Sequence, residues 1–279
     1  MDPREIDALV QRLAVDPYDD QTRRDSDRVA TLYREHGERQ ELAALLEKQV
    51  AALAPMAERD SEIRARLAVL HEEIGQLWIE PPLSTAVHSA DHAAKHFRRA
   101  LELAPSSMFA AFHLREIYKK AGMWSEALPL YAAEIAFEKE PARIVALRRD
   151  EAITRRHAND FSGAIGALHH ARQYDDKEPG LQYEYAAAVV HCVQSGAAIT
   201  DQERTIATEL LVGLAEMYDG EYGYSYAMGA LGLDPKHVRA RELATYHARH
   251  KGAAVEVDGT LEAELLSSSA LIEDLEDEL

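Results

Sequence analysis

The stretch AAKHFRRALELAPSSMFAAFHLREIYKKAGMWSEALPLYAAEIAFEKEP, residues 93–141, decides the fold class of this chain. It holds two apolar-periodic segments on either side of Gly122, and it contains Pro105 and Pro141, which lie 36 residues apart. Proline has no backbone N–H and cannot continue a helix interior, so each proline predicts the end of a helix. The stretch therefore predicts a helix–turn–helix unit closed by proline.

The same ending, an apolar helix that closes on proline, recurs along the chain. It occurs at Pro17, Pro55, Pro105, Pro141, Pro179 and Pro235, at intervals of 38, 50, 36, 38 and 56 residues. Between these prolines the apolar residues follow the spacing of amphipathic helices. The clearest stripes are Leu42, Leu45, Leu46, Val50 and Leu53; Ile63, Leu67, Leu70, Ile74 and Leu77; and Val29, Leu32 and Tyr33, before a helix end at Gly37. Helix pairs repeated at this period predict stacked hairpins that bury each other's apolar faces.

Small and aromatic residues within these hairpins follow a known family pattern. Ala111, Leu114 and Tyr118 hold the family's first-helix spacing, and Ala127, Tyr131 and Pro141 complete that unit, while Ala93, Phe97, Ala100 and Pro105 match the second-helix half of the unit before it. In these features the chain resembles the tetratricopeptide repeat (TPR) family. It departs from the family at Arg115, where the family usually has glycine.

The resemblance implies an all-α fold, a right-handed solenoid of stacked antiparallel helix pairs. We expect one repeat domain over residues 1–252, with about five to six irregular units and an insertion near residues 80–91. Between Pro179 and Pro235 the pattern predicts three helices, at about 181–194, 201–218 and 221–233. An acidic tail follows over residues 253–279, in which Leu271, Leu275 and Leu279 share one side and Ser269 could cap a short helix.

The charge of the chain argues against some classes of binding partner. The net charge is −18, and the tail alone carries nine acidic residues without Lys or Arg. An acidic surface repels phosphate groups, so the sequence argues against nucleic-acid binding and against anionic membrane surfaces. No apolar run reaches the roughly 20 residues that cross a bilayer. The single cysteine, Cys192, favours a reducing cytoplasm, and the excess of Arg over Lys suggests a bacterial source.

Catalytic motifs are absent from the sequence, so we expect neither an enzyme nor a cofactor. There is no HExxH motif, no GxSxG motif and no phosphate-binding glycine loop. The exception is a candidate zinc site at His88, His92 and His96, which are spaced four residues apart. Because His92 and His96 flank Ala93 and Phe97, the alternative places both histidines on the solvated side of the helix.

Residues 143–156, RIVALRRDEAITRR, form a basic stretch in an otherwise acidic protein. The resemblance implies that first helices line a concave ligand groove, and arginine binds carboxylates bidentately. These two points predict a groove for a protein or an acidic peptide, and the alternative is a solvated, salt-bridged helix face. The groove candidates are Phe109, Phe112, Arg115, Lys119, Arg148, Arg149, Arg155, Arg156 and Tyr185.

Three functional hypotheses follow from these observations. The first is a cytoplasmic scaffold or adaptor that binds a peptide or protein surface in the groove. In the second, the acidic tail regulates that adaptor by folding onto residues 143–156, or serves as a recruitment motif itself. The third, from a different class, is a metal-binding module or metalloenzyme at His88, His92 and His96.

Overall fold

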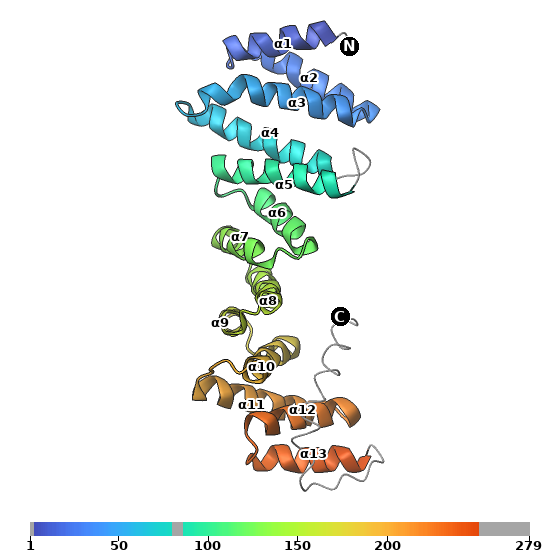
Figure 1. The fold of residues 1–279 in the computed structure, drawn as a ribbon, viewed down its shortest axis with the longest axis vertical. Coiled ribbons are helices and arrows are strands. Elements are labelled where there is room, and N and C mark those ends of the chain that lie inside the picture. The colour runs from blue at the N-terminus through green and yellow to red at the C-terminus, as the bar shows by residue number, and fades with distance from the viewer. Residues whose placement is uncertain (1–2, 80–85, 251–279) are drawn as a thin grey trace. The chain divides into compact units, whose positions relative to one another are not determined.

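The computed structural model describes residues 3–79 and 86–250, and within these ranges it contains helices and turns but no strand (Figure 1). No helix in this part of the chain is long and apolar enough to cross a membrane. Contacts divide the chain into two units, Met1–Glu138 and Lys139–Leu279, which are called unit 1 and unit 2 below. The all-α prediction is confirmed, and the extent of a single repeat domain over residues 1–252 stays a prediction.

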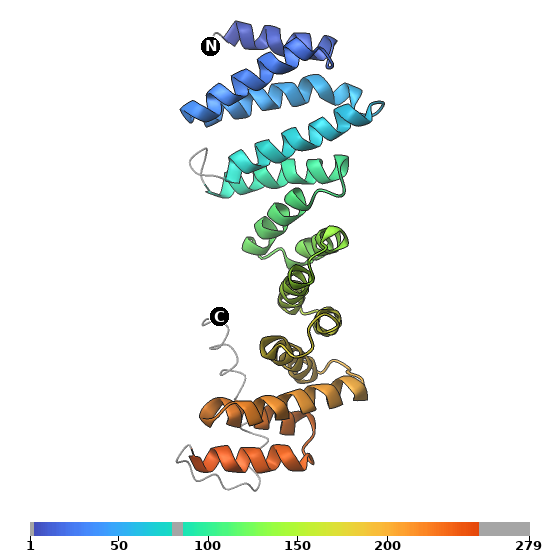
Figure 2. The same ribbon diagram turned by 180° about the vertical axis from the view of Figure 1, so that it is seen from behind.

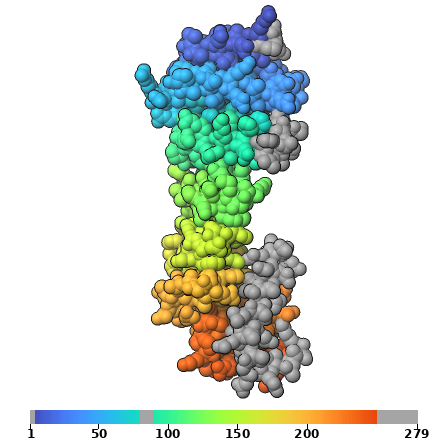
Figure 3. Space-filling model, in the orientation of Figure 1, coloured from blue at the N-terminus to red at the C-terminus, as the bar shows by residue number. Residues whose placement is uncertain are grey.

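Unit 1 is built from helix hairpins. Its elements are α1 (Pro3–Val15), α2 (Asp20–His36), α3 (Arg39–Leu53), the short 3-10 turn η1 (Ala54–Met56), α4 (Ser61–Ile79), α5 (Ala86–Leu103), α6 (Met108–Lys120) and α7 (Trp124–Phe137). The hairpins are α2/α3, α4/α5 and α6/α7, and α1 packs on α3. Figures 1 and 2 show that successive helices of this unit lie side by side and alternate in direction. In the space-filling view their side chains close the spaces between the ribbons (Figure 3).

Unit 2 repeats this arrangement. Its elements are α8 (Pro141–His157), α9 (Phe161–Arg172), α10 (Pro179–Gln194), α11 (Asp201–Met217), α12 (Gly220–Leu233) and α13 (Val238–His250). The hairpins are α8/α9, α10/α11 and α12/α13. The first helix of each hairpin also contacts the first helix of the next, α8 with α10 and α10 with α12, and the second helix α11 contacts α13. The three helices predicted between Pro179 and Pro235 are α10, α11 and α12.

Capping residues set several helix ends. Asp19 accepts a hydrogen bond from the backbone N–H of Thr22 and begins α2, while Gly37, at φ 70°, ends it as the sequence predicts. A residue in this left-handed conformation closes a helix at little cost when it is glycine. At α11, Thr200 and Glu203 form a reciprocal capping box. Short capped connections of this kind turn each helix back on its predecessor.

The hairpins pack through alanine and aromatic residues. Phe97 of α5 is fully buried beside Ala93 and Ala100, and Gly75 of α4 lies directly against its ring. Small residues let the two backbones approach, and the aromatic ring fills the space between them. In α6 and α7 the same roles fall to the buried residues Ala111, Leu114, Ala127 and Tyr131.

Two details of the predicted helices differ from the structure. Leu32 is 44% exposed, although it was predicted to share a face with Val29 and Tyr33. The buried stripe of α2 runs instead through Thr22, Ser26, Val29, Ala30 and Tyr33. The predicted insertion at 80–91 is shorter, because α5 already begins at Ala86. The remaining residues of the insertion, 80–85, and the acidic tail lie outside the described residues.

Candidate interaction surfaces

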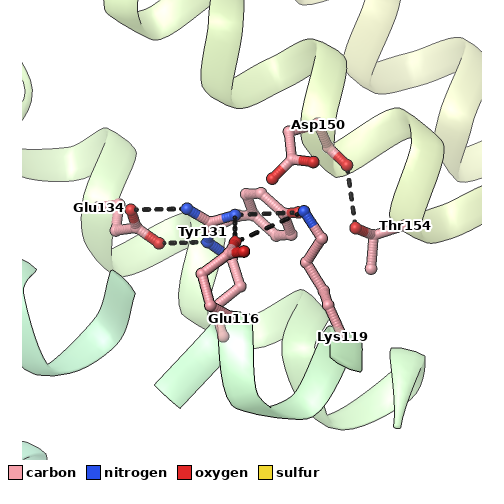
Figure 4. A network of polar contacts seen from close by, with 7 residues as sticks. Glu116, Lys119, Tyr131, Glu134, Asp150 and Thr154 are labelled. Carbon is pink, nitrogen blue, oxygen red and sulfur yellow. Dashed lines mark hydrogen bonds and ion pairs between the residues drawn. The ribbon is translucent and has the colours of Figure 1, made fainter. Parts of the chain in front are cut away.

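Arg115, predicted to line a ligand groove, is buried between α6 and α7. Its side chain is 4% exposed, and its Nε lies 2.7 Å from Oε1 of Glu134, whose own side chain is 6% exposed (Figure 4). The guanidinium carbon lies 4.6 Å from the ring centroid of Tyr131 and 5.3 Å from that of Phe112. A larger side chain at the family's glycine position thus points between the helices, and Glu134 balances its charge. The prediction of Arg115 as a groove residue was wrong.

Lys119, a further groove candidate, lies one turn along α6 from Arg115. Its Nζ is 3.5 Å from Oε1 of Glu116, and that same oxygen accepts a hydrogen bond of 2.9 Å from Nη1 of Arg115 (Figure 4). One carboxylate therefore faces both cations. This arrangement offsets part of the positive charge that an acidic ligand would need on α6.

Two of the predicted arginines of α8 are paired within the hairpin α8/α9. Nη1 of Arg148 donates to Oε2 of Glu151 over 2.8 Å, and Nε of Arg155 donates to Oε1 of the same carboxylate over 2.9 Å. Arg155 also reaches Asp160. Glu151 is only 4% exposed, so the arginines flank a buried carboxylate. Its charge is stabilised by these hydrogen bonds, since an unpaired buried carboxylate would be costly.

The other two predicted groove arginines of α8 join it to α10. Arg149 forms a bidentate pair with Glu184, with Nε 2.8 Å from Oε2, and these hydrogen bonds raise the pKa of Arg149. Nη2 of Arg156 lies 3.3 Å from Nε2 of His191. Both contacts join positions 35 residues apart. They connect the first helices of successive repeats, which is the salt-bridged alternative to a basic groove.

Unit 1 contains the same kind of connection between first helices. Arg34 of α2 binds Glu73 of α4, and Nη2 of Arg23 lies 3.2 Å from Oε1 of Glu62. Each of these pairs spans 39 residues. Ionic contacts at a nearly constant separation therefore recur between successive first helices in both units.

Tyr185, the last groove candidate, belongs to the core of unit 2. It is 1% exposed and lies on the buried stripe of α10 with Leu181, Ala188 and Cys192. Burial raises the pKa of both the Tyr185 phenol and the Cys192 thiol. Arg172 lies with its guanidinium carbon 5.0 Å from the Tyr185 ring centroid. The prediction that Tyr185 faces a ligand was wrong, because this position falls on the α10 stripe that is packed into the core.

Phe109 and Phe112 are the groove candidates that remain exposed apolar groups, each at 44%. Both contact His113 on α6, with ring-centroid distances of 4.4 Å from Phe109 and 5.1 Å from Phe112. The His113 ring also stacks on the buried ring of Phe97 at 5.3 Å, and burial lowers its pKa. The two phenylalanines form an exposed aromatic surface anchored on the core of unit 1.

A second aromatic surface, which sequence reasoning missed, lies in unit 2. The tyrosine patch consists of Tyr183 on α10, Tyr222 and Tyr226 on α12, and Tyr218 in the turn between α11 and α12. The Tyr226 ring lies 5.7 Å from the rings of both Tyr183 and Tyr218. Tyr218 and Tyr222 are 41% and 46% exposed. The alternating tyrosines of EYGYSYAM, residues 221–228, are the sequence signal for this surface.

Of the three histidines considered for zinc, His92 and His96 have other aromatic or imidazole partners in the structure. Nδ1 of His96 is 2.9 Å from Nδ1 of His71 on α4, and burial lowers the pKa of both imidazoles to about 4. His96 therefore faces α4 rather than the solvated side, while exposed His92 stacks on Trp78 at 4.6 Å. The side chain of His88 lies outside the described residues. In the described part of the chain no group of three His, Cys, Asp or Glu residues is arranged to hold a metal ion.

Comparisons with known proteins complete this description. No family model matches the sequence. No curated protein matches it either. Among solved structures, YrrB, described as a TPR protein with an unusual peptide-binding site, is 15% identical with a TM-score of 0.42, covering 73% of this chain and 92% of that one. The C-terminal part of a TPR protein from Cytophaga hutchinsonii is 11% identical with a TM-score of 0.43, covering 85% and 92%.

A third solved structure, MamA from Desulfovibrio magneticus RS-1, is 15% identical with a TM-score of 0.37, covering 70% of this chain and 93% of that one. The architecture itself rests on the helices described above. Antiparallel pairs recur, first helices contact first helices in unit 2, and alanines pack against aromatic rings between the pairs. The described residues therefore form an all-α fold of stacked antiparallel helix pairs.

Proposed function

We propose that this chain is a protein-interaction scaffold that binds a peptide or protein segment at the tyrosine patch of unit 2. The observation that carries the proposal is the joining of tyrosine rings from two successive first helices, α10 and α12, through Tyr226. A ligand that crosses these helices touches both repeats at once. The stacked hairpins hold the rings in place before binding.

Exposed tyrosines suit this role physically. Tyrosine provides a large apolar area and a polar hydroxyl, and it loses little conformational entropy when it is immobilised. Tyrosine is also enriched among the residues that contribute most to binding at protein interfaces. Tyr218 and Tyr222 remain close to half exposed, so their burial by a ligand would remove substantial apolar area from water.

The surroundings of the patch favour a ligand that is not acidic. Asp219 and Glu221 are exposed beside Tyr218 and Tyr222, which makes the rim negative. The arginines of α8, predicted to attract an acidic peptide, already face carboxylates or His191. A segment with apolar groups and an occasional Lys or Arg therefore matches the patch better. Such a scaffold needs neither a catalytic residue nor a cofactor, and a cytoplasmic location stays part of the proposal.

The test starts from peptides selected by display against the immobilised full chain. The affinity of a selected peptide is then measured by calorimetry for the wild type, for Tyr222→Ser and for Tyr174→Ser. Tyr174 is a matched control, because it is a 52% exposed tyrosine outside the patch. Tyr222→Ser should weaken binding by about tenfold or more, as for a central interface tyrosine, and Tyr174→Ser should have no effect. Equal affinity of the peptide for all three proteins would show that it does not bind at the tyrosine patch.

A second series separates the proposal from the predicted basic groove. Phe112→Ser probes the aromatic surface of α6, which is also 44% exposed. Arg156→Gln probes α8. If affinity falls in Arg156→Gln and not in Tyr222→Ser, the ligand is acidic and binds at α8. If it falls only in Phe112→Ser, the scaffold role holds but the contact lies on unit 1.

A further inference from the structure

The outward face of α13 is apolar and basic. One side of this helix is buried through Ala240, Leu243, Ala244, His247 and Ala248. The other side carries Val238, Arg241, Glu242, Thr245, Tyr246 and Arg249. These positions follow the three- and four-residue spacing of a single helix face. Val238 is 71% exposed and Tyr246 50% exposed, so the face presents apolar area to water.

The arginines on this face differ from those of α8. Within residues 3–79 and 86–250, Arg249 has no ion-pair partner, and Arg241 donates only to the carbonyl oxygen of Pro235, over 2.8 Å. Glu242, the acid on the same face, is bound by Arg239, which also binds Glu216. Among the described residues, these two guanidinium groups of α13 thus have no carboxylate partner, in a chain whose net charge is −18.

The position of α13 in the stack explains the exposed face. Along unit 2 each hairpin is covered by the next, and α11 is packed against α13. α13 is the final helix of the described residues, and within residues 3–79 and 86–250 no further hairpin follows it to cover its outward face. Repeat stacks need a terminal cover that hides apolar surface and presents polar groups to solvent. An amphipathic, acidic occupant would therefore suit this face.

The chain itself supplies a segment of that chemistry. Residues 269–279, SALIEDLEDEL, contain five acidic residues, no Lys or Arg, and Leu271, Leu275 and Leu279 at four-residue spacing. We propose that this segment binds along the outward face of α13, with its leucines on Val238 and Tyr246 and its carboxylates on Arg241 and Arg249. Each charge-assisted carboxylate–guanidinium contact is stronger than a neutral hydrogen bond.

The length of the intervening chain fits this contact. α13 has 13 residues and is therefore about 20 Å long. Residues 251–268 form an 18-residue connection, whose root-mean-square span as a flexible chain is about 23 Å. A tether whose typical span matches the length of the helix to be crossed gives the highest effective concentration, which is millimolar for short linkers. Modest intrinsic affinity then suffices to keep the segment bound.

One alternative binding place for the tail and one alternative occupant of the α13 face are less suited. The basic stretch 143–156, the other place where the tail could bind, has its arginines paired already, as described above. A second copy of the chain would bring a net charge of −18 against the same overall charge, which opposes association. The contact proposed here is independent of any ligand at the tyrosine patch.

Amide hydrogen exchange on the full chain tests the proposal, with four variants compared. They are wild type, Arg241→Glu with Arg249→Glu, a tail variant with Glu273→Lys and Glu276→Lys, and the combination of both pairs. Arg143→Glu is the matched control, since Arg143 is a 70% exposed arginine of the basic stretch on α8.

In the wild type, amides of residues 271–279 should exchange about tenfold more slowly than in a free peptide of that sequence. Either charge reversal should remove this protection, and the combined charge swap should restore it, which also shows that the variants fold. Arg143→Glu should leave protection unchanged. Exchange at the free-peptide rate in the wild type would overturn the proposal, and so would protection lost only in Arg143→Glu. Protection that rises with protein concentration would assign the tail to a second copy and overturn the intramolecular contact.

Discussion

Arg115 of α6 and Glu134 of α7 form a salt bridge from which water is almost excluded, with side chains 4% and 6% exposed. The guanidinium also lies over the ring of Tyr131, which is fully buried. A lone charge at this place would cost several kcal/mol, whereas the paired charges are each satisfied. The hairpin α6/α7 therefore depends on both partners being present.

Removing one partner of this pair should destabilise the hairpin strongly. Arg115→Leu should lower the free energy of opening α6 and α7 by about 3–5 kcal/mol, because buried Glu134 then loses the guanidinium that balances its charge. Exchange of the buried α6 and α7 amides measures this energy. Arg99→Leu is the control, since Arg99 is 53% exposed and pairs with exposed Glu102. It should cost less than about 1 kcal/mol.

The double variant Arg115→Leu with Glu134→Leu distinguishes pairing from packing. Replacing both charges by apolar groups removes the uncompensated carboxylate, so it should recover most of the loss. If the double variant is instead less stable than either single one, the contribution of Arg115 lies in its packing against Tyr131 and Phe112.

The close approach of α4 and α5 predicts an unusual cost for a small substitution. A Cβ at Gly75 would lie 2.8 Å from Cε1 and Cζ of Phe97, which is too close for carbon atoms. Gly75→Ala should therefore destabilise unit 1 by about 1–3 kcal/mol through overpacking. Gly213→Ala in α11 is the control, because nothing lies within 4 Å of its Cβ position. It should stabilise the protein by about 0.5–1 kcal/mol through helix propensity, and thermal unfolding measures both effects.

The helices could be predicted from the sequence because their signals are local. A stripe such as Ile63, Leu67 and Leu70 and a stop such as Gly37 both depend on residues within a few turns of one another. All three stripe residues are buried, and Gly37 has the left-handed conformation of a helix end. Local periodicity and capping chemistry determine such features without knowledge of the tertiary fold.

The surfaces could not be predicted in the same way, because their character depends on distant residues. The charge of Arg149 is balanced by Glu184, 35 residues away, and Arg115 is balanced by Glu134, 19 residues away. A count of charges in 143–156 does not include these partners. Tyr185 likewise lies on α10 with Tyr183, and only the packing of neighbouring helices decides that one ring is buried while the other joins the tyrosine patch.

The contact between Arg149 and Glu184 should connect α8 to α10 with a modest, salt-dependent energy. The side chains are 33% and 21% exposed, so solvent screens part of the attraction. A double-mutant cycle with Arg149→Met and Glu184→Gln should give a coupling of about 0.5–1 kcal/mol at low salt and less at high salt. The cycle of Arg143→Met and Glu140→Gln, an exposed pair on α8, should give almost none. Equal coupling in both cycles would mean that the first pair does not join the helices.

The neutral imidazole pair of His71 and His96 should make unit 1 sensitive to mild acid. Burial holds the pKa of each ring at about 4, against 6.5 in the unfolded chain. Between these values the unfolded state binds more protons than the folded one, so stability rises with pH in this window. The neutral pair makes its full contribution to the free energy of unfolding above about pH 6.5, and this contribution is lost progressively as the pH falls toward 4.

Urea unfolding followed at pH 7, 6 and 5 measures this effect, in a range above the titration of most carboxylates. The unfolding midpoint of the wild type should fall across the series. In His96→Gln the fall should be smaller, because one of the two coupled groups is gone and the remaining His71 no longer faces a second titrating ring. His170→Gln is the matched control, since His170 is exposed and should leave the slope unchanged. If the midpoint falls equally in His96→Gln and in the wild type, the His71–His96 pair is not the source of the acid sensitivity.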